Sequence, residues 1–178
     1  MIPPTPMSIR QIMGELENRL IRIPDFQREL VWTPNQVETL LDSIYKGYPL
    51  GSFLMWHTTE NLQEKNPLNF PVRRDAVDKK YLLDGQQRAV VMYGIFRNNL
   101  KLSKGRTKVE YRAYFDFSTQ TFNLYKKRDI GAQKVRLSIT QVPLDELVII
   151  DTERGSTDKS ALLRGIERRL IRTMRRLS

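Results

Sequence analysis

Five consecutive polar or small residues, Asp84-Gly85-Gln86-Gln87-Arg88, lie at the junction of two apolar segments. The segment before them ends in KYLL and is typical of a strand, whereas AVVMYGIF after them is typical of a helix. A strand that turns directly into a helix places polar side chains at the carboxyl edge of a sheet, where ligands bind in many α/β folds. The helix N-terminus offers free N–H groups and a partial positive charge, which suit a phosphate.

Each residue of this turn has a chemistry that suits such a ligand. Gly85 permits a sharp turn and a close approach by the ligand. Asp84 can hold a metal ion, accept hydrogen bonds from a ligand or cap the helix. Gln86 and Gln87 can orient a water molecule or a base, and Arg88 can bind a phosphate through two N–H groups. An Asp cap followed by Gln-Gln-Arg on a helix surface would explain the same residues without any ligand.

A second polar cluster lies in IPDFQRELVW, residues 23–32, where Gln27 and Arg28 follow a predicted strand. They stand between the apolar anchors Phe26 and Trp32, and the bland alternative is a turn with a surface arginine. Two polar loops at strand ends can converge on one ligand. We therefore predict that Asp84, Gln87 and Arg88 share one pocket with Gln27 and Arg28.

These motifs carry a resemblance to a known family. The stretch IPDFQRELVWTPNQVETLLDSIYKGYPLGSFLMW, followed by LLDGQQR, resembles the N-terminal domain of GmrSD-type restriction proteins, a branch of the ParB–sulfiredoxin superfamily. The resemblance runs over residues 8–96 and more loosely to about residue 150. It implies a ParB-like fold and a nucleotide-binding, often NTP-hydrolysing, module that serves in restriction and phage defence.

The family's FQR motif maps onto residues 26–28, its DGQQR motif onto residues 84–88, and its YPLG turn onto residues 48–51. The resemblance implies that the backbone of the YPLG turn lines the same pocket. The implied ligand is a nucleoside triphosphate with a divalent ion, Mg²⁺, held by Asp84. Arg28 and Arg88 would hold phosphates, and Gln86 or Gln87 would orient the attacking water. The implied nucleotide-binding set is Gln27, Arg28, Gly51, Gly85 and Arg88, and the implied catalytic set is Asp84, Gln86, Gln87 and Arg88.

Other functions remain open at this point. The chain can be a non-catalytic DNA-binding or partner-docking module in which the motifs preserve a fold or a nucleotide switch. A direct nuclease built on Asp84 is less favoured, because metal-assisted cleavage usually uses two metal ions and one carboxylate is too few. Many family members carry a His-Asn-His nuclease domain, but this chain has one histidine, His57, so a nuclease is expected on a partner chain or in a further domain.

The positive charge is confined to the C-terminal half. Residues 1–96 carry 11 Lys and Arg and 11 Asp and Glu, whereas residues 97–136 carry 11 against 3, an excess of +8 within the total of +10. Clustered positive charge attracts polyanions, so DNA is an expected partner, and a solvated basic surface is the alternative. The side chains predicted to track a phosphate backbone are Lys108, Arg112, Lys126, Lys127 and Arg128.

The 178 residues suffice for one domain with a core. The predicted fold class is α+β, a mixed sheet with flanking helices. In chain order we expect a helix capped by Ser8, a strand IRIP, a helix from Thr33-Pro34 to Gly47 and a buried strand SFLMWHT. A polar loop over 60–78, the strand and helix that flank residues 84–88, and a hairpin from VEYRAYFDF and TFNLYKK follow. We assign residues 1–150 to a ParB/sulfiredoxin-like nucleotide-binding domain. Residues 151–178 form a basic C-terminal segment, with its helix over 158–177.

The composition excludes several classes of protein. There are no cysteines, which excludes disulfides, thiolate metal sites and the thiol repair of the sulfiredoxin branch. No apolar run approaches the roughly 20 residues that span a bilayer, and the N-terminus lacks an apolar signal region, so we expect a cytoplasmic protein with no membrane partner. A homo-oligomer remains open.

Overall fold

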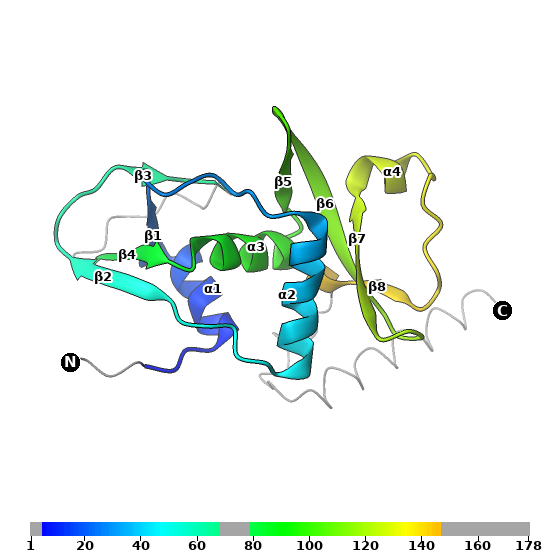
Figure 1. The fold of residues 1–178 in the computed structure, drawn as a ribbon, viewed down its shortest axis with the longest axis horizontal. Coiled ribbons are helices and arrows are strands. Elements are labelled where there is room, and N and C mark those ends of the chain that lie inside the picture. The colour runs from blue at the N-terminus through cyan, green and yellow to red at the C-terminus, as the bar shows by residue number, and fades with distance from the viewer. Residues whose placement is uncertain (1–4, 68–78, 147–178) are drawn as a thin grey trace.

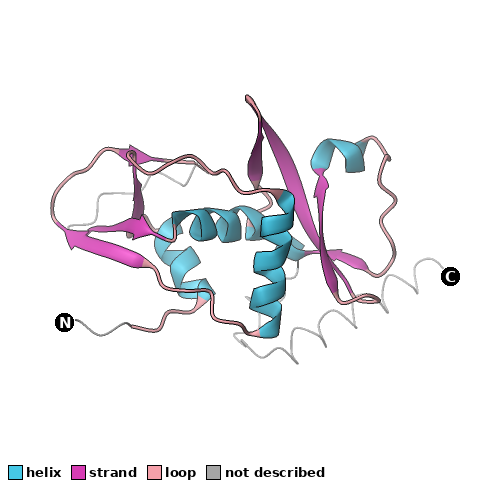
Figure 2. Ribbon diagram, viewed as in Figure 1, coloured by secondary structure: helices cyan, strands magenta, loops and turns pink. Residues whose placement is uncertain are grey.

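The computed structural model describes residues 5–67 and 79–146, and these residues form an α+β fold with two sheets. Figure 2 shows strands at two ends of the molecule with helices between them. The prediction of an α+β class is therefore confirmed, although the strands divide into two sheets. In chain order the elements are α1 (Ile9–Glu17), β1 (Ile21–Pro24), α2 (Pro34–Lys46), β2 (Leu54–Thr58), β3 (Glu64–Lys65), β4 (Lys79–Asp84), α3 (Gln86–Phe96), β5 (Lys101–Lys104), β6 (Thr107–Asp116), β7 (Thr121–Lys126), α4 (Lys127–Gly131) and β8 (Gln141–Pro143).

The first sheet has the strand order β2-β4-β1-β3 and is mixed. The pair β1–β4 is parallel, whereas β4 pairs with β2, and β1 with β3, in antiparallel fashion. The short β3 lies inside the segment predicted as a polar loop. The prediction that SFLMWHT is buried is wrong, because β2 is an edge strand on which Leu54 and Trp56 are 59% and 44% exposed.

The second sheet is antiparallel and is built around the long strand β6. The predicted hairpin is confirmed as β6 and β7, which pair from Tyr111↔Lys126 to Asp116↔Thr121. The strands β5 and β8 pair with opposite halves of β6, and neither they nor the short helix α4 were predicted. Strands β5 and β8 are short, spanning 4 and 3 residues, so their own sequences carry too little periodic pattern to predict them.

Helix α3 forms the middle of the core. After its polar first turn, residues 89–96 are apolar on every face, and Val90, Val91 and Ile95 are each at most 3% exposed. A helix that is hydrophobic all round must be covered on all sides. Figure 1 shows α3 between the two sheets, flanked by α1 and α2. Gly94 permits a close approach, since a Cβ there would lie 3.0 Å from the Cα of Leu100.

The ends of α1 and α2 follow the predicted signals. Ser8 and Thr33 each form a capping box, accepting a hydrogen bond from the backbone N–H three residues later. Gly47 ends α2 in the left-handed conformation, with φ of 72°. These local signals position α2, whose Glu38 accepts a hydrogen bond from the N–H of Leu124 in β7 at 2.8 Å. Helix α2 is thereby attached to the second sheet.

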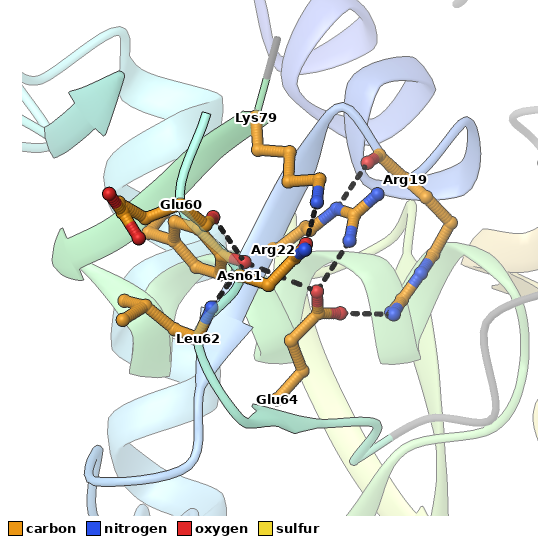
Figure 3. A network of polar contacts seen from close by, with 8 residues as sticks. Arg19, Arg22, Glu60, Asn61, Leu62, Glu64 and Lys79 are labelled. Carbon is orange, nitrogen blue, oxygen red and sulfur yellow. Dashed lines mark hydrogen bonds and ion pairs between the residues drawn. The ribbon is translucent and has the colours of Figure 1, made fainter. Parts of the chain in front are cut away.

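A polar network fixes the end of the first sheet where β1 and β4 begin (Figure 3). Arg22 of β1 is 5% exposed at its side chain and donates to Glu64 of β3 at 2.5 Å, and Arg19 donates to the other oxygen of Glu64. Lys79 donates to Asn61, and the backbone N–H of Leu62 donates to the hydroxyl of Tyr81 at 3.0 Å. The network therefore ties the segment that carries β3 to the start of both parallel strands.

Within the described part of the chain, no helix combines the length and the apolar character needed to cross a membrane. The predicted basic segment, residues 151–178, and its helix over 158–177 lie outside the described residues.

Candidate functional site

The parallel pairing of β1 and β4 brings the two sequence motifs to one edge of the first sheet. Ile21 pairs with Lys80 and Arg22 with Tyr81, so both strands point the same way. The FQR motif follows the end of β1, and the DGQQR motif begins at the last residue of β4. Both motifs therefore follow the carboxyl ends of adjacent strands, which is the geometry in which α/β folds place ligand sites.

A direct hydrogen bond joins the two motifs. Nε2 of Gln27 donates to the carbonyl oxygen of Leu83 at 2.9 Å. The pairing of β4 with β2 shifts between Leu54 and Met55, which leaves Leu83 without a partner in β2. Such bulges bend a strand and re-aim its side chains, and the side chain of Asp84 is here 72% exposed.

Gln87 clamps the loop that carries the FQR motif. Its Oε1 accepts from the N–H of Val31 at 3.0 Å, and its Nε2 donates to the carbonyl of Glu29 at 2.9 Å. One side chain thus satisfies a donor and an acceptor of the loop backbone, as a neighbouring strand would. The Nζ of Lys65 in β3 also donates to the carbonyl of Gln27. The loop is therefore attached both to α3 and to the first sheet.

Arg88 is held by the backbone of the turn that precedes β2. Nη1 donates to the carbonyl of Leu50, and Nη2 donates to the carbonyl of Ser52 at 2.7 Å. The guanidinium lies 4.9 Å from the ring centroid of Phe53, and Nη2 lies 3.7 Å from Oδ2 of Asp84. The side chain is 19% exposed. Arg88 thus positions residues 50–53, a role that the sequence did not predict.

Two glycines make room for this arrangement. Gly51 has φ of 79°, and a Cβ there would lie 2.7 Å from Nη1 of Arg88. Gly85 has φ of 89°, and a Cβ there would lie 2.5 Å from Cδ1 of Phe53. Gly85 is the N-cap of α3, and no side chain caps this helix. The alternative in which Asp84 caps the helix is therefore wrong.

Two polar side chains of the motifs keep their hydrogen-bonding groups uncommitted. Gln86 is 5% exposed, yet its carboxamide makes no hydrogen bond within the described residues. Arg28 is exposed, and no described carboxylate pairs with it. The contacts described above link five polar or glycine residues of the two motifs: Gln27, Asp84, Gly85, Gln87 and Arg88. Arg28 and Gln86 are their neighbours in sequence.

The basic residues predicted to contact DNA each have a carboxylate neighbour. The pairs are Lys108–Glu29 at 2.9 Å, Arg112–Asp145 at 2.8 Å, Arg112–Glu146 at 3.0 Å, Lys126–Asp129 at 3.9 Å, Lys127–Glu110 at 3.6 Å and Arg128–Asp129 at 3.3 Å. Hydrogen bonding to Asp145 raises the pKa of Arg112, whose side chain is 25% exposed. Arg112 is therefore a structural bridge here, whereas Arg128 is 73% exposed. Their contact with DNA stays a prediction.

A sequence profile described as the GmrSD restriction endonuclease N-terminal domain matches residues 9–176. The chain belongs to this family. The match spans both motifs and nearly the whole chain, so the resemblance predicted from residues 8–96 is confirmed. The GmrSD family membership connects the domain with restriction, a defence against foreign DNA.

A relative of unknown function also matches this GmrSD-type domain. The uncharacterized protein MJ0686 of Methanocaldococcus jannaschii is 33% identical over 110 residues, which cover 55% of this chain and 18% of the relative. The chain therefore spans less than a fifth of that protein's length. Its name adds no activity, so the activity must be argued from the GmrSD-type domain itself.

The sequence reasoning did not predict which backbone groups the motif side chains contact, although the resemblance implied that the backbone of the YPLG turn, residues 48–51, lines the same pocket. The carbonyls of Leu50 and Ser52 hold Arg88, and the backbone of residues 29–31 holds Gln87. Backbone groups exist at every residue, so residue types alone do not single these out. Gly51 was the available signal, since a glycine beside a polar motif indicates a close approach. Phe26 of the FQR motif and Tyr48 of the YPLG turn also have exposed side chains, at 66% and 59%.

Proposed function

We propose that this GmrSD-type domain binds a nucleoside triphosphate at the corner formed by the FQR loop, the DGQQR turn and residues 50–53. The observation that carries the proposal is the joining of the two arginine-containing loops, through Gln27 to Leu83 and through Gln87 to Glu29 and Val31. Phosphoryl chemistry depends on positioned charge more than on covalent catalysis, and this corner supplies positioned charge.

The groups at the corner suit a polyphosphate. The N–H groups in the first turn of α3 have no helical acceptor and no capping side chain, so they can donate to phosphate oxygens. Arg28 is exposed without an ion pair in the described part of the chain and supplies a free guanidinium. Arg88 already donates to two carbonyls, so we assign it first to holding residues 50–53 and second to a phosphate through its remaining N–H groups.

The donor set fits a divalent ion that arrives with the nucleotide. No group of three or more His, Cys, Asp or Glu side chains that could hold a metal occurs among the described residues. Mg²⁺ commonly uses one or two carboxylates together with phosphate oxygens and waters. Asp84, with its 72% exposed side chain, is the carboxylate that would hold the ion, which would neutralise phosphate charge.

We further propose that the bound triphosphate is hydrolysed. A water attacks the γ-phosphorus, the bond from that phosphorus to the β,γ-bridging oxygen breaks, and the products are a nucleoside diphosphate, inorganic phosphate and a proton. Gln86 is favoured over Gln87 as the residue that orients the water, because both ends of the Gln87 carboxamide are engaged with the loop. The parallel β1–β4 pair beside this corner supports a ParB/sulfiredoxin-like fold.

The restriction system gives this reaction its context. We propose that nucleotide binding or hydrolysis regulates an attack on DNA by a nuclease on a partner chain or in a further domain. The alternative of a non-catalytic DNA-binding or docking module is favoured by the +8 excess over residues 97–136. The two functions separate in one respect, because only the first requires release of inorganic phosphate.

The test is nucleotide affinity in an Arg28→Ala variant. We expect calorimetry to show that wild type binds Mg·ATP or Mg·GTP and that Arg28→Ala binds it roughly 10- to 100-fold more weakly, the range for a lost hydrogen bond to a charged group. Arg136→Ala is the matched control, because Arg136 is also exposed and unpaired within the described residues. Equal affinity in all three proteins contradicts the proposed corner. Gln86→Ala should retain nucleotide affinity, but its rate of inorganic phosphate release should fall about tenfold or more.

A further inference from the structure

Strands β5 and β6 form a narrow two-stranded ribbon that extends from the body of the molecule. Lys101 pairs with Glu110 and Lys104 with Thr107, so the two strands are joined by two residues. The first of these, Gly105, has φ of 62°, which a tight hairpin turn requires. In Figure 1 this turn projects beyond the neighbouring elements.

The base of the ribbon is anchored, and its tip is free. Leu102 is 2% exposed and Val109 packs against the core. The hydroxyl of Ser103 donates to the carbonyl of Leu30 at 3.2 Å, which joins the ribbon to the FQR loop. Residues 104–108 are all exposed. The ribbon is therefore a paired projection that is anchored at its base.

The ribbon carries four basic residues and one acidic residue over residues 101–110. Lys101 pairs with Glu110 at 3.1 Å, and Lys108 pairs with Glu29 at 2.9 Å. At the tip, Lys104 and Arg106 have no carboxylate partner in the described part of the chain. Their charge is therefore available to a polyanion, whereas the residues predicted from the sequence, such as Arg112, are already paired.

We propose that the tip of the β5–β6 ribbon, with Lys104 and Arg106, is a contact for duplex DNA. A two-stranded ribbon has the width that the major groove admits, and Lys and Arg at its tip reach the phosphates that border the groove. The sequence KLSKGRTK of residues 101–108 contains no aromatic residue, so the ribbon has no stacking platform for single-stranded bases. The proposal rests on the restriction function proposed above for its choice of DNA.

The ribbon is joined to the nucleotide corner through Glu29. Glu29 accepts from Nε2 of Gln87 through its carbonyl and pairs with Lys108 through its carboxylate. The hydrogen bond from Lys108 lowers the pKa of the Glu29 carboxyl. One residue thus connects α3, the FQR loop and the ribbon.

The test uses two double variants that each remove two positive charges. Lys104→Ala/Arg106→Ala removes the tip charges, whereas Lys134→Ala/Arg136→Ala removes exposed charges after α4. Fluorescence anisotropy with a short labelled duplex should show the tip variant binding about tenfold more weakly at low salt. Its slope of log affinity against log salt should flatten by about 2 units, and the control should keep most of the wild-type slope.

Three outcomes overturn the ribbon proposal. They are the absence of duplex binding by wild type at low salt, an equal loss in both variants, which would indicate bulk charge, and a tip-dependent preference for single-stranded DNA or RNA of equal length. Calorimetry with Mg·ATP or Mg·GTP on the same proteins keeps this test apart from that of the nucleotide corner. The tip variant should bind nucleotide as wild type does. If wild type does not bind nucleotide, only the proposed nucleotide site is contradicted.

Discussion

Gly51 and Arg88 are in such close contact that any side chain at residue 51 would displace the guanidinium. A Cβ there would lie 2.7 Å from Nη1 of Arg88, and Gly51 already has a left-handed φ of 79°. The contact allows Arg88 to donate to the carbonyls of Leu50 and Ser52 on either side of the glycine. Arg88 therefore joins the start of α3 to the backbone that precedes β2.

The variant Gly51→Ala tests this contact against Gly47→Ala. Gly47 has a similar φ of 72°, but nothing lies within 4 Å of its Cβ position. We expect Gly47→Ala to lower the free energy of unfolding by about 1 kcal/mol through backbone strain alone. Gly51→Ala should cost roughly 1.5–3 kcal/mol more, because it also disturbs hydrogen bonds of a charged group. Equal losses in urea unfolding would show that the Arg88 contact contributes nothing.

Replacing Gln87 with Ala should release the FQR loop. The N–H of Val31 loses its acceptor, so its amide hydrogen exchange should accelerate by about tenfold or more. The N–H of Leu124 in β7 is a matched internal control, because its acceptor is also a side chain, that of Glu38 in α2, and does not involve Gln87. Unchanged exchange at Val31, measured by NMR, would mean that the loop holds its conformation without the clamp.

Glu64→Gln should destabilise the start of the first sheet. The substitution removes the charge that receives Arg19 and the nearly buried Arg22, and we expect a loss of about 2–3 kcal/mol in the free energy of unfolding. Glu60→Gln is the control, since Glu60 is exposed and joins the network through its backbone carbonyl, which accepts from Tyr81. The free energies of unfolding of the two variants are compared by thermal and urea unfolding. A loss in Glu64→Gln no larger than that in Glu60→Gln would show that the network does not stabilise the fold.

Acid should weaken the second sheet through Asp116. Hydrogen bonds from Ser118, and then from Thr140, lower the pKa of this carboxyl below its ordinary value, against the opposing effect of burial. A lowered folded-state pKa means that the stabilisation is present above the unfolded-state value, about 3.9, and is lost as the pH falls through the folded-state value. In urea unfolding at each pH, Asp116→Asn should therefore lose less stability than wild type as the pH falls from about 5 to about 3. An identical loss would contradict the assignment.

The fold was predictable where strong local signals occur. The Thr33-Pro34 start and the Gly47 stop define α2, and the apolar pattern of IRIP indicates β1. The short strands β3, β5 and β8 depend on partners distant in the sequence, so no local pattern defines them. The exposure of Leu54 and Trp56 was also out of reach, because apolar residues in a strand do not reveal that the strand lies at an edge.

The candidate site was predictable as a meeting of two motifs but not as a set of contacts. Both motifs were predicted to follow strand ends, and the parallel pairing of β1 with β4 and the Gln27–Leu83 hydrogen bond bring them together. The different contacts of the Gln86 and Gln87 side chains could not be predicted from the sequence, since two adjacent glutamines have the same chemistry. Helix geometry separates them: Gln87 meets the loop, whereas Gln86 is buried.

A titration of the ¹⁵N-labelled chain with Mg·ATP, and in parallel with Mg·GTP, tests the nucleotide corner most directly. The account predicts chemical-shift changes that concentrate at the N–H groups of residues 26–28, 51–53 and 85–88, with the amides of the β5–β6 tip, residues 104–107, changing far less. The changes should saturate, and they should be weakened in Arg28→Ala. Shifts confined to the basic ribbon, or no shifts with either nucleotide, would contradict the claim that the two motifs form a nucleoside triphosphate site.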